Sequence, residues 1–429
     1  MCVTHDLMID GLNYWKVVIK SETGRNRLFL VFSLSFKVCL VTFMLFQNNL
    51  YNNAKSIQLS LIHIHDFFPG SNNTIYSNMR VLVVGAGPTG LTAANELCFN
   101  GIKPKVIEKR TNASNLSRAI GILSKTLDDF EHLGIKSTIL ERGVHITHAN
   151  LFLNDTLAMN LNIAKLTNRI NVISLPQDQT EKILEDNLNK NDVFVEYGVG
   201  YESAVKNPNN SLDVTFSNGK TETFDFIIGC DGSNSRVASS IGIKKVGYTL
   251  PEDWFIVDFY SKAQNIDCAS ISRCNEGLRF LMRMADKRYR IVSNYKVDLD
   301  KLPHNLEVSS VFREAAFKIT VAQVKTYSKD NIVLCGDAAH THSPVGGRGM
   351  NLGINDAFNA VQAIIENDLN KYNLSQHRKG EEIIKMTEAM RKRITSNNPL
   401  NKLMLKFFVG ILSRTERLQR IVAKRVTRF

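Results

Sequence analysis

Residues Arg80–Gly90 read RVLVVGAGPTG, an apolar run that leads into three glycines spaced as GxGxxG. The valine-rich run predicts a buried strand, and the residues from Gly90 to Asn100 predict a helix that ends at Gly101. In such a unit the first glycine permits a tight turn, the second lets the backbone approach a pyrophosphate, and the third lets the helix pack close to the strand. The stretch therefore predicts a phosphate-bearing ligand at the start of this helix.

The next apolar run, Lys105–Glu108, predicts the second strand of the same unit. It ends in Glu108, eighteen residues beyond Gly90, and a carboxylate at this place can accept hydrogen bonds from both ribose hydroxyls of an adenosine. The alternative is a glycine-rich turn followed by an unrelated surface glutamate. Because strand, turn, helix and acid all occur in order, we favour the dinucleotide interpretation.

Two further glycine motifs follow predicted strands. Phe226–Arg236 reads FIIGCDGSNSR, with the strand predicted over Thr223–Ile228, but taken alone it indicates only an Asp-Gly turn. Cys335–Met350 reads CGDAAHTHSPVGGRGM and lies between a predicted strand, Asn331–Leu334, and a predicted helix, Asn351–Ile365. Glycines there would bring backbone N–H groups against a flat ring, and the helix N-terminus would favour a cofactor that becomes anionic on reduction.

Together the three motifs resemble the FAD-dependent aromatic-ring hydroxylases, single-component flavoprotein monooxygenases with the p-hydroxybenzoate-hydroxylase fold. The resemblance covers about residues 79–429. It implies an α/β fold in which a parallel-sheet, Rossmann-like FAD domain is interleaved with a β-rich substrate domain and followed by a helical C-terminus. The expected FAD domain comprises residues 79–142, 177–243 and 331–370, and the expected substrate domain residues 143–176 and 244–330. C-terminal helices are expected over residues 371–429.

The resemblance also assigns roles to single residues. A Glu like Glu108 holds the adenosine ribose, an Arg like Arg118 and a Gln like Gln177 lie near FAD, and Asp337 meets the flavin ribityl chain. The expected cofactor-binding set is Gly85, Gly87, Pro88, Thr89, Gly90, Glu108, Arg110, Arg118, Gln177, Asp231, Gly232, Gly336, Asp337, Pro344, Gly347, Gly349 and Asn351. No catalytic side chain is assigned, because the flavin does the chemistry. Pro344 and Arg348 are expected to line the ring; a solvent-facing Arg348 is the alternative.

The activity implied is hydroxylation of a small aromatic, phenolic substrate through a flavin C4a-hydroperoxide, with NAD(P)H and O2 as co-substrates. The alternatives are a flavoprotein of the same fold with another activity, such as a prenyl-lipid reductase or a halogenase, or a non-catalytic FAD-binding module. The halogenase WxWxIP pattern is absent, since Trp15 and Trp254 are the only tryptophans. Trp254 is expected to belong to the core rather than to stack on a substrate.

Charge and cysteine content narrow the class of protein. The net charge is +12, but residues 371–429 alone carry 15 Lys/Arg against 4 Asp/Glu, and no motif for nucleic-acid binding accompanies them. Nucleic acid is therefore not expected as a partner. The seven cysteines show no CxxC pattern, which favours a reducing, cytoplasmic location over a disulfide framework. His340 and His342 lack a third ligand at suitable spacing, so no metal site is expected.

Both ends of the chain raise the question of membrane contact. Residues 1–78 read as an N-terminal extension, either spurious or carrying a candidate membrane segment at residues 28–46, which Lys37 makes unfavourable. Near the C-terminus, apolar residues from Leu400 to Val422 keep helical spacing, with arginines and lysines off that stripe. Packing of this stripe onto the FAD domain is the favoured interpretation, and an amphipathic membrane contact is the alternative.

Overall fold

The computed structural model describes residues 2–9, 12–20, 26–32, 41–42, 78–114, 118–169, 172–262, 266–284, 287–396 and 398–427. The chain divides into two compact units, Met1–Pro69 and Gly70–Phe429. The first holds an antiparallel sheet in the order β1-β2-β3-β4. Its strands are β1 (Cys2–Ile9), β2 (Leu12–Lys20), β3 (Asn26–Phe32) and β4 (Val41–Thr42).

The candidate membrane segment at residues 28–46 begins inside β3, which pairs with β2. Residues 33–40 and 43–46 of that segment lie outside the described residues. In the part of the chain that the structure describes, no helix is both long enough and apolar enough to cross a bilayer.

The second unit is built on a six-stranded sheet in the order β12-β6-β5-β16-β23-β22. All neighbours pair in parallel except β22, which is antiparallel to β23. The central strands are short, fully apolar and buried on both faces, as parallel strands covered on both sides require. The strands are β5 (Val81–Val84), β6 (Lys105–Glu108), β12 (Val195–Tyr197), β16 (Phe226–Gly229), β22 (Ser328–Lys329) and β23 (Ile332–Leu334).

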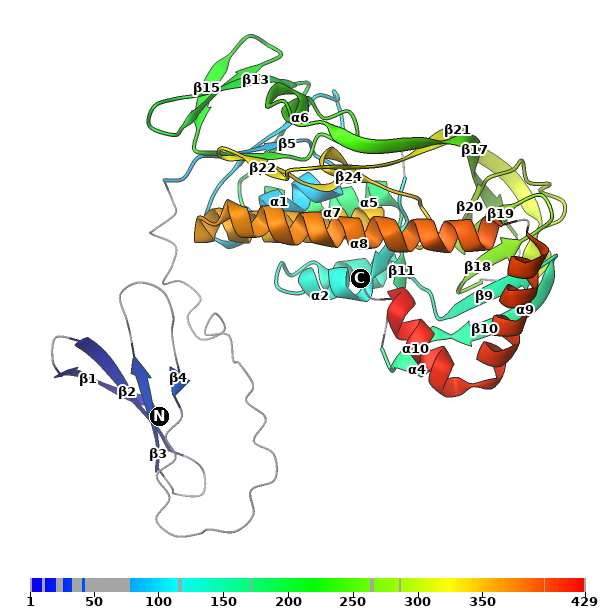
Figure 1. The fold of residues 1–429 in the computed structure, drawn as a ribbon. Helices are drawn as coiled ribbons and strands as arrows, with labels where there is room; N and C mark the ends of the chain where they lie inside the picture. Colours follow the sequence, from blue (N-terminus) through cyan, green and yellow to red (C-terminus); the bar gives the residue numbers. More distant parts are fainter. Residues whose placement is uncertain are drawn as a thin grey trace. The chain divides into compact units, whose positions relative to one another are not determined.

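Three helices lie against one another beside this sheet and run along its face (Figure 1). They are α1 (Pro88–Phe99), α5 (Gln177–Asn189) and α7 (Gly349–Glu366). A small antiparallel sheet inserted before β16 contains β13 (Tyr201–Lys206), β14 (Leu212–Phe216) and β15 (Thr221–Phe224), and α6 (Arg236–Ser240) contacts β13. The expected parallel-sheet domain is present.

One strand that the sequence predicts is divided into two strands in the structure. The sequence predicts a single strand over Thr223–Ile228, but β15 ends at Phe224 and β16 begins at Phe226. Asp225 separates them: its backbone N–H donates to the carbonyl of Arg80, and its carboxylate accepts from the Arg80 N–H at 2.7 Å. The chain changes sheets at Asp225 because these bonds to Arg80 replace the ladder.

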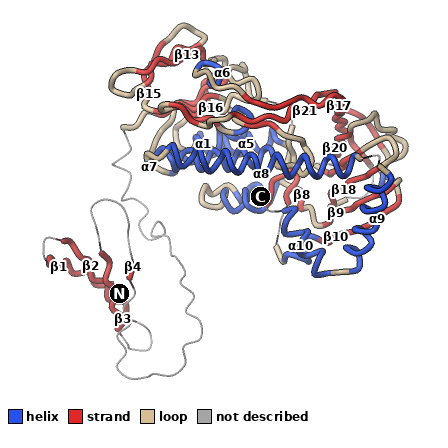
Figure 2. Tube along the Cα trace, viewed as in Figure 1, coloured by secondary structure: helices blue, strands red, loops and turns tan. Residues whose placement is uncertain are grey.

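An eight-stranded sheet forms the other half of this unit, in the order β10-β9-β18-β19-β20-β17-β21-β24 (Figure 2). Two of its strands, β17 and β21, are 17 residues long and carry register shifts where they pair. The strands are β9 (His148–Leu153), β10 (Thr156–Asn162), β17 (Lys245–Ser261), β18 (Cys268–Arg273), β19 (Leu278–Arg283), β20 (Arg288–Ser293), β21 (Val308–Val324) and β24 (His340–Thr341). The 3-10 helix η2 (Pro303–Asn305) follows β20.

Shorter elements connect the two halves. A three-stranded sheet has the order β7-β11-β8, with strands β7 (Gly121–Leu123), β8 (Val144–His145) and β11 (Val172–Ser174). The short helices are α2 (Ser124–Asp129), α3 (Lys136–Arg142), α4 (Ile163–Thr167) and the 3-10 helix η3 (Gly336–Ala338).

The C-terminal part is helical, as expected, with α8 (Leu369–Thr395), α9 (Pro399–Arg414) and α10 (Glu416–Thr427). The predicted packing of its apolar stripe onto the FAD domain is wrong. Helix α9 contacts β10 and α10 contacts α4, and most residues of the stripe stay exposed. Trp254 is fully buried, so its assignment to the core is confirmed.

Candidate flavin site

The candidate site lies at one edge of the parallel sheet. Because β6, β5, β16 and β23 are parallel neighbours, their carboxyl ends meet there. Glu108 ends β6, and Gly85 follows β5. The Asp-Gly motif (Asp231-Gly232) follows β16, and the Gly-Asp motif (Gly336-Asp337) follows β23. Four stretches that are spread from Gly85 to Asp337 thus reach the same edge, and all three glycine motifs are among them.

The first glycine turn leaves no room for a side chain at Gly85 or at Gly90. Gly85 has φ +103°, and a Cβ there would lie 2.5 Å from the carbonyl oxygen of Cys230. A Cβ on Gly90 would lie 1.9 Å from the carbonyl oxygen of Gly85. At Gly87, by contrast, no atom lies within 4 Å of the position a Cβ would take, so the turn is open on that side. The geometry suits close approach of a ligand to the backbone.

Helix α1 begins at this turn, with Gly87 at its N-cap and Pro88 at its first position. No side chain caps it and its first turn holds no acid, so its N-terminal N–H groups suit an anion. Thr89 points elsewhere: its hydroxyl lies where a Cβ on Gly336 or Gly353 would come, at 2.7 and 2.5 Å. Thr89 therefore packs the first motif against the last.

Glu108 is buried beside the first turn. Its carboxylate accepts from the Ala86 N–H at 2.9 Å and from the Arg110 N–H at 2.9 Å, and it pairs with the Arg110 guanidinium at 3.1 Å. Burial alone would raise the pKa of Glu108, but the hydrogen bonds from Arg110 and Ala86 and the Arg110 charge outweigh it, so its pKa is lowered. Arg110 Nη2 also donates to this carboxylate at 3.2 Å, so a ribose hydroxyl would have to share or displace the Arg110 guanidinium there.

The Asp-Gly motif caps a helix. One oxygen of Asp231 accepts from the N–H groups of Arg236 and Val237 at 2.6 and 3.1 Å, at the start of α6. Its other oxygen is buried and has no hydrogen-bond partner among the described residues. No atom lies within 4 Å of the place where a Cβ on Gly232 would come, so this turn too is open on one side. An unpartnered buried carboxylate oxygen beside open space fits a ligand hydroxyl.

Lys245 joins the second and third motifs, and sequence reasoning missed it. Its ammonium donates to the carbonyls of Ser233 and Asp337, both at 2.6 Å. Burial lowers the pKa of Lys245, and the charges of Asp337 and Asp231 act against this. A single lysine at the start of a strand gives no signal in the sequence, because its partners lie far along the chain.

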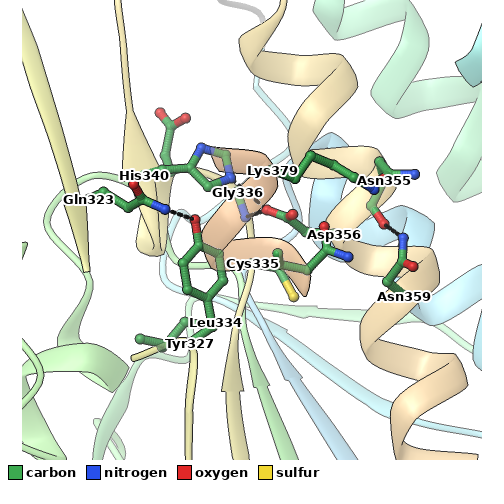
Figure 3. Close-up of polar contacts among 12 residues, drawn as sticks. Gln323, Tyr327, Leu334, Cys335, Gly336, His340, Asn355, Asp356, Asn359 and Lys379 are labelled. Carbon is green, nitrogen blue, oxygen red and sulfur yellow. Dashed lines mark hydrogen bonds and ion pairs between the residues drawn. The ribbon is translucent and has the colours of Figure 1, made fainter. Parts of the chain in front are cut away.

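Asp356 holds the turn at Gly336 and Asp337 in place, and sequence reasoning did not identify this residue either. It lies on α7, fully buried, and one of its oxygens accepts from the Gly336 N–H at 3.0 Å and lies 2.6 Å from His340 Nε2 (Figure 3). Gly336 and His340 flank Asp337, whose own side chain is exposed. The clamp on both sides therefore fixes where the Asp337 carboxylate is presented.

Asn351 holds the late glycine loop, which is the segment Cys335–Met350, through every hydrogen-bonding atom of its side chain. Its amide oxygen accepts from Leu123 N–H and Thr126 Oγ1, both at 2.8 Å, and its amide nitrogen donates to the carbonyls of Gly121 and Gly347 at 2.9 and 3.0 Å. These four bonds exhaust an asparagine side chain. Asn351 thus ties the loop to β7 and α2.

The rest of the late loop surrounds the N-terminus of α7, which has no side-chain cap and no acid in its first turn. Gly347 is exposed and has open space around its Cα, Pro344 is half-buried, and Gly349 lies beside the His342 ring. Arg348 is only 3% exposed, so the solvent-facing alternative is wrong. Burial lowers the pKa of its guanidinium.

Gln177 is bonded to the segment that contains Arg118. Gln177 begins α5, accepts from the Ala119 N–H at 3.0 Å and donates to Glu181 at 2.8 Å. Burial raises the pKa of Glu181 to about 7, although the bond from Gln177 opposes this. Arg118 is exposed, and its backbone carbonyl accepts from the Arg290 guanidinium at 2.8 Å. Residues 118–119 are therefore held from both halves of the unit.

An apolar cluster of the eight-stranded sheet meets the late loop. Val345, between Pro344 and Gly346, packs in one buried cluster with Trp254, Leu278, Ile319 and Val321. The indole N–H of Trp254 is buried and has no hydrogen-bond partner among the described residues. No group of three or more His, Cys, Asp or Glu within those residues is placed to hold a metal ion.

The comparisons with known proteins agree with this geometry. A family model described as "FAD binding domain" matches residues 78–298 and 296–368, which is well over half of the chain. The chain belongs to this family of FAD-binding domains. The open glycine turns, the two uncapped helix N-termini and the unpartnered Asp231 oxygen fit FAD, and the residues that hold them are those placed around the sheet edge above.

The chain is similar to monooxygenases among both the curated proteins and the solved structures. Pentachlorophenol 4-monooxygenase of Sphingobium chlorophenolicum is 29% identical over 313 residues, which are 66% of this chain and 57% of that protein. The chain thus spans little more than half of that relative. The p-nitrophenol 4-monooxygenase PnpA of Pseudomonas putida has a TM-score of 0.72 at 18% identity, covering 81% of this chain and 98% of that chain.

The same fold also carries other chemistry. PyrE3, a Diels-Alderase in pyrroindomycin biosynthesis, has a TM-score of 0.67 at 22% identity, covering 81% of this chain and 80% of that chain. These likenesses confirm the predicted fold class. They leave the reaction to be argued from the site.

Proposed function

We propose that this chain is an FAD-dependent monooxygenase that hydroxylates a small phenolic substrate with NAD(P)H and O2. The observation that carries the proposal is the meeting of the late glycine loop with the apolar face of the eight-stranded sheet, at Val345 and Trp254. FAD, when bound, would supply the electrons from NAD(P)H and the activation of O2. The named relative that acts on pentachlorophenol supports an aromatic substrate.

The chain's own residues bind and orient. The N-terminus of α1 would hold the pyrophosphate, Glu108 the adenosine ribose, and Asp337 the ribityl chain. The late loop, fixed by Asn351, would present backbone N–H groups to the ring. The buried apolar cluster behind Val345 would support the loop and keep water away from it on that side. The domain boundaries within residues 79–429 stay a prediction from the sequence.

Two alternatives stay open. PyrE3 shows that the fold supports a reaction that is not a hydroxylation, and a non-catalytic FAD-binding module would need only the sheet edge. The test measures how fast the FAD-loaded full chain consumes NADH and NADPH, with and without a panel of phenols. It separates the proposed hydroxylase from both alternatives. The proposal expects a phenol to stimulate consumption and to yield a hydroxylated product. FAD binding without any stimulated consumption would contradict the activity while leaving the flavin site intact.

The variants Glu108→Ala and Asp337→Ala are expected to lose activity for different reasons. Glu108→Ala removes a charged acceptor worth roughly 1.5–3 kcal/mol, so FAD affinity should fall about ten- to a hundred-fold. Saturating FAD should restore most of the activity, since the adenosine end is far from the reacting ring. Asp337→Ala should also weaken FAD, but excess FAD should not restore the ratio of product to NAD(P)H consumed.

The measurement is product formed and hydrogen peroxide released per NAD(P)H consumed, at saturating FAD. The exposed carboxylate of Asp300 gives a matched control, because Asp300→Ala removes a charge of the same kind away from the sheet edge. Full coupling in Asp337→Ala, or persistent peroxide release in Glu108→Ala with FAD in excess, would show that the two assignments are wrong.

A further inference from the structure

Helix α9 has two apolar faces, and the body of the protein covers only one. Val409 and Leu412 are buried on the face toward β10. At about 100° per residue, a second group of apolar residues falls on the opposite side of the helix. These residues are 40% to 70% exposed: Leu400, Leu403, Met404, Phe407, Phe408 and Ile411.

The next helix, α10, exposes cations beside two apolar residues, Leu418 and Ile421. In α10, Ala423 is buried in a small cluster with Ile163 and Leu166 of α4, which fixes the inner face. Arg417, Arg420 and Lys424 are exposed on the other side. Pro399–Thr427 carries seven Lys/Arg and a single acid, Glu416, which pairs with Arg420 at 3.1 Å. An uncovered apolar face is thus followed directly by a strongly basic one.

Helices α9, α10 and α4 lie together at one end of the unit, with α9 beside β10 (Figure 1). The exposed Lys165 of α4 adds another cation there. Scattered single apolar residues on a surface need no explanation, but six on one face of one helix do. Their spacing matches the pattern of helices that lie in a membrane interface, with aromatic and aliphatic residues on one face and Lys/Arg beside it.

We propose that α9 and α10 form a docking surface for an anionic lipid bilayer. The apolar face of α9 would enter the boundary between headgroups and acyl chains, and the cations of α10 would bind the acidic headgroups. Helix α9 has 16 residues, or about 24 Å, which is shorter than a bilayer-spanning helix needs to be. It would therefore lie in the interface plane and not cross it.

Charge favours a bilayer over a second copy of the chain. A symmetric dimer through α9 would bring two copies of the basic segment Pro399–Thr427 together, with one acid each to offset them. Acidic headgroups instead neutralise that charge. The same excess of positive charge thus argues against self-association and for a negatively charged surface.

The test is co-sedimentation of the full-length, FAD-loaded chain with vesicles of phosphatidylcholine, with and without phosphatidylserine. Binding is expected only when phosphatidylserine is present, and it should weaken when salt rises from about 0.1 M to about 0.5 M. The double variant F407S/F408S, which alters two residues at least 52% exposed, should lose at least about tenfold in vesicle affinity. R417Q/R420Q/K424Q should lose a similar factor at low salt.

Phe194→Ser is the matched control, because Phe194 is 66% exposed and lies outside the C-terminal helices. It should bind vesicles like the parent. No binding by the parent, or equal binding by the parent and F407S/F408S, would overturn the proposal; the second result would place the contact elsewhere in the chain. A parent dimer that F407S/F408S converts to a monomer, without vesicle binding, would overturn it in favour of a second copy.

Discussion

Asp356→Ala is expected to weaken FAD binding by about a hundred-fold or more. The substitution leaves the Gly336 N–H and His340 Nε2 without their common acceptor, in a place where both are buried. Each unsatisfied buried group costs about 1–3 kcal/mol, so the loop that carries Asp337 should leave its native position. The chain should lose about 2–6 kcal/mol in free energy of unfolding as well.

The conservative variant separates position from charge. In Asp356→Asn the amide oxygen can still accept from Gly336, so its FAD affinity should fall between those of the parent and Asp356→Ala. Asn359→Ala is the control: Asn359 lies on the same helix, and its side chain donates to the carbonyl of Asn355 at 2.6 Å (Figure 3). Flavin fluorescence titration, visible circular dichroism of the bound flavin and urea unfolding give the three readouts.

Visible circular dichroism decides between a positioning role and a merely structural one. If Asp356 positions the loop, the spectrum of bound flavin should change in Asp356→Asn even at saturating FAD. A spectrum identical to that of the parent, with only stability reduced, would show that the clamp serves the fold alone.

The glycine turns could be predicted from the sequence because their constraints are local. Gly85 has a positive φ and Gly90 packs on the carbonyl of Gly85, so the turn itself requires both, and the whole signal lies within the eleven residues Arg80–Gly90. Glu108 follows from the same unit. Asp356 and Lys245 could not be found this way, because an isolated Asp in a helix or Lys in a strand acquires meaning only through partners that the fold brings close.

The errors have physical reasons too. The strand predicted across Asp225 was divided because Arg80, far away in sequence, binds the Asp225 backbone and side chain. The packing of α9 was misassigned because both of its faces are apolar, so periodicity marks the helix but does not choose the buried face. Burial of Arg348 depends on how the late loop folds over it, which spacing does not specify.

Asp258→Ala is expected to destabilise the chain by about 3–5 kcal/mol, the cost of leaving a buried charge without its partner. Asp258 on β17 faces Arg290 on β20, and the two make a bidentate pair with both bonds at 2.7 Å. Both side chains are almost fully buried, and Arg313 of β21 lies 3.7 Å from the same carboxylate. Without Asp258, the two guanidinium groups would face each other in the sheet.

The double variant Asp258→Leu/Arg290→Met tests this cause. Replacing a buried pair with apolar residues of similar size often leaves stability close to that of the parent. The free energy of unfolding, measured with urea, should therefore return most of the way to the parent value. If the double variant stays as unstable as Asp258→Ala, the uncompensated charge of Arg290 is not the reason.

FAD affinity should not recover together with stability. Arg290 also donates to the carbonyl of Arg118 at 2.8 Å, and in the double variant nothing replaces that bond. Residues 118–119 would lose this tie to the eight-stranded sheet while the bond to Gln177 remains, so FAD should still bind several-fold more weakly than to the parent at equal stability. Equal FAD affinity in parent and double variant would contradict this link. Restored stability with weakened FAD binding would instead show that one arginine serves two separate purposes: it neutralises a charge within the eight-stranded sheet, and it holds a loop of the flavin site in place.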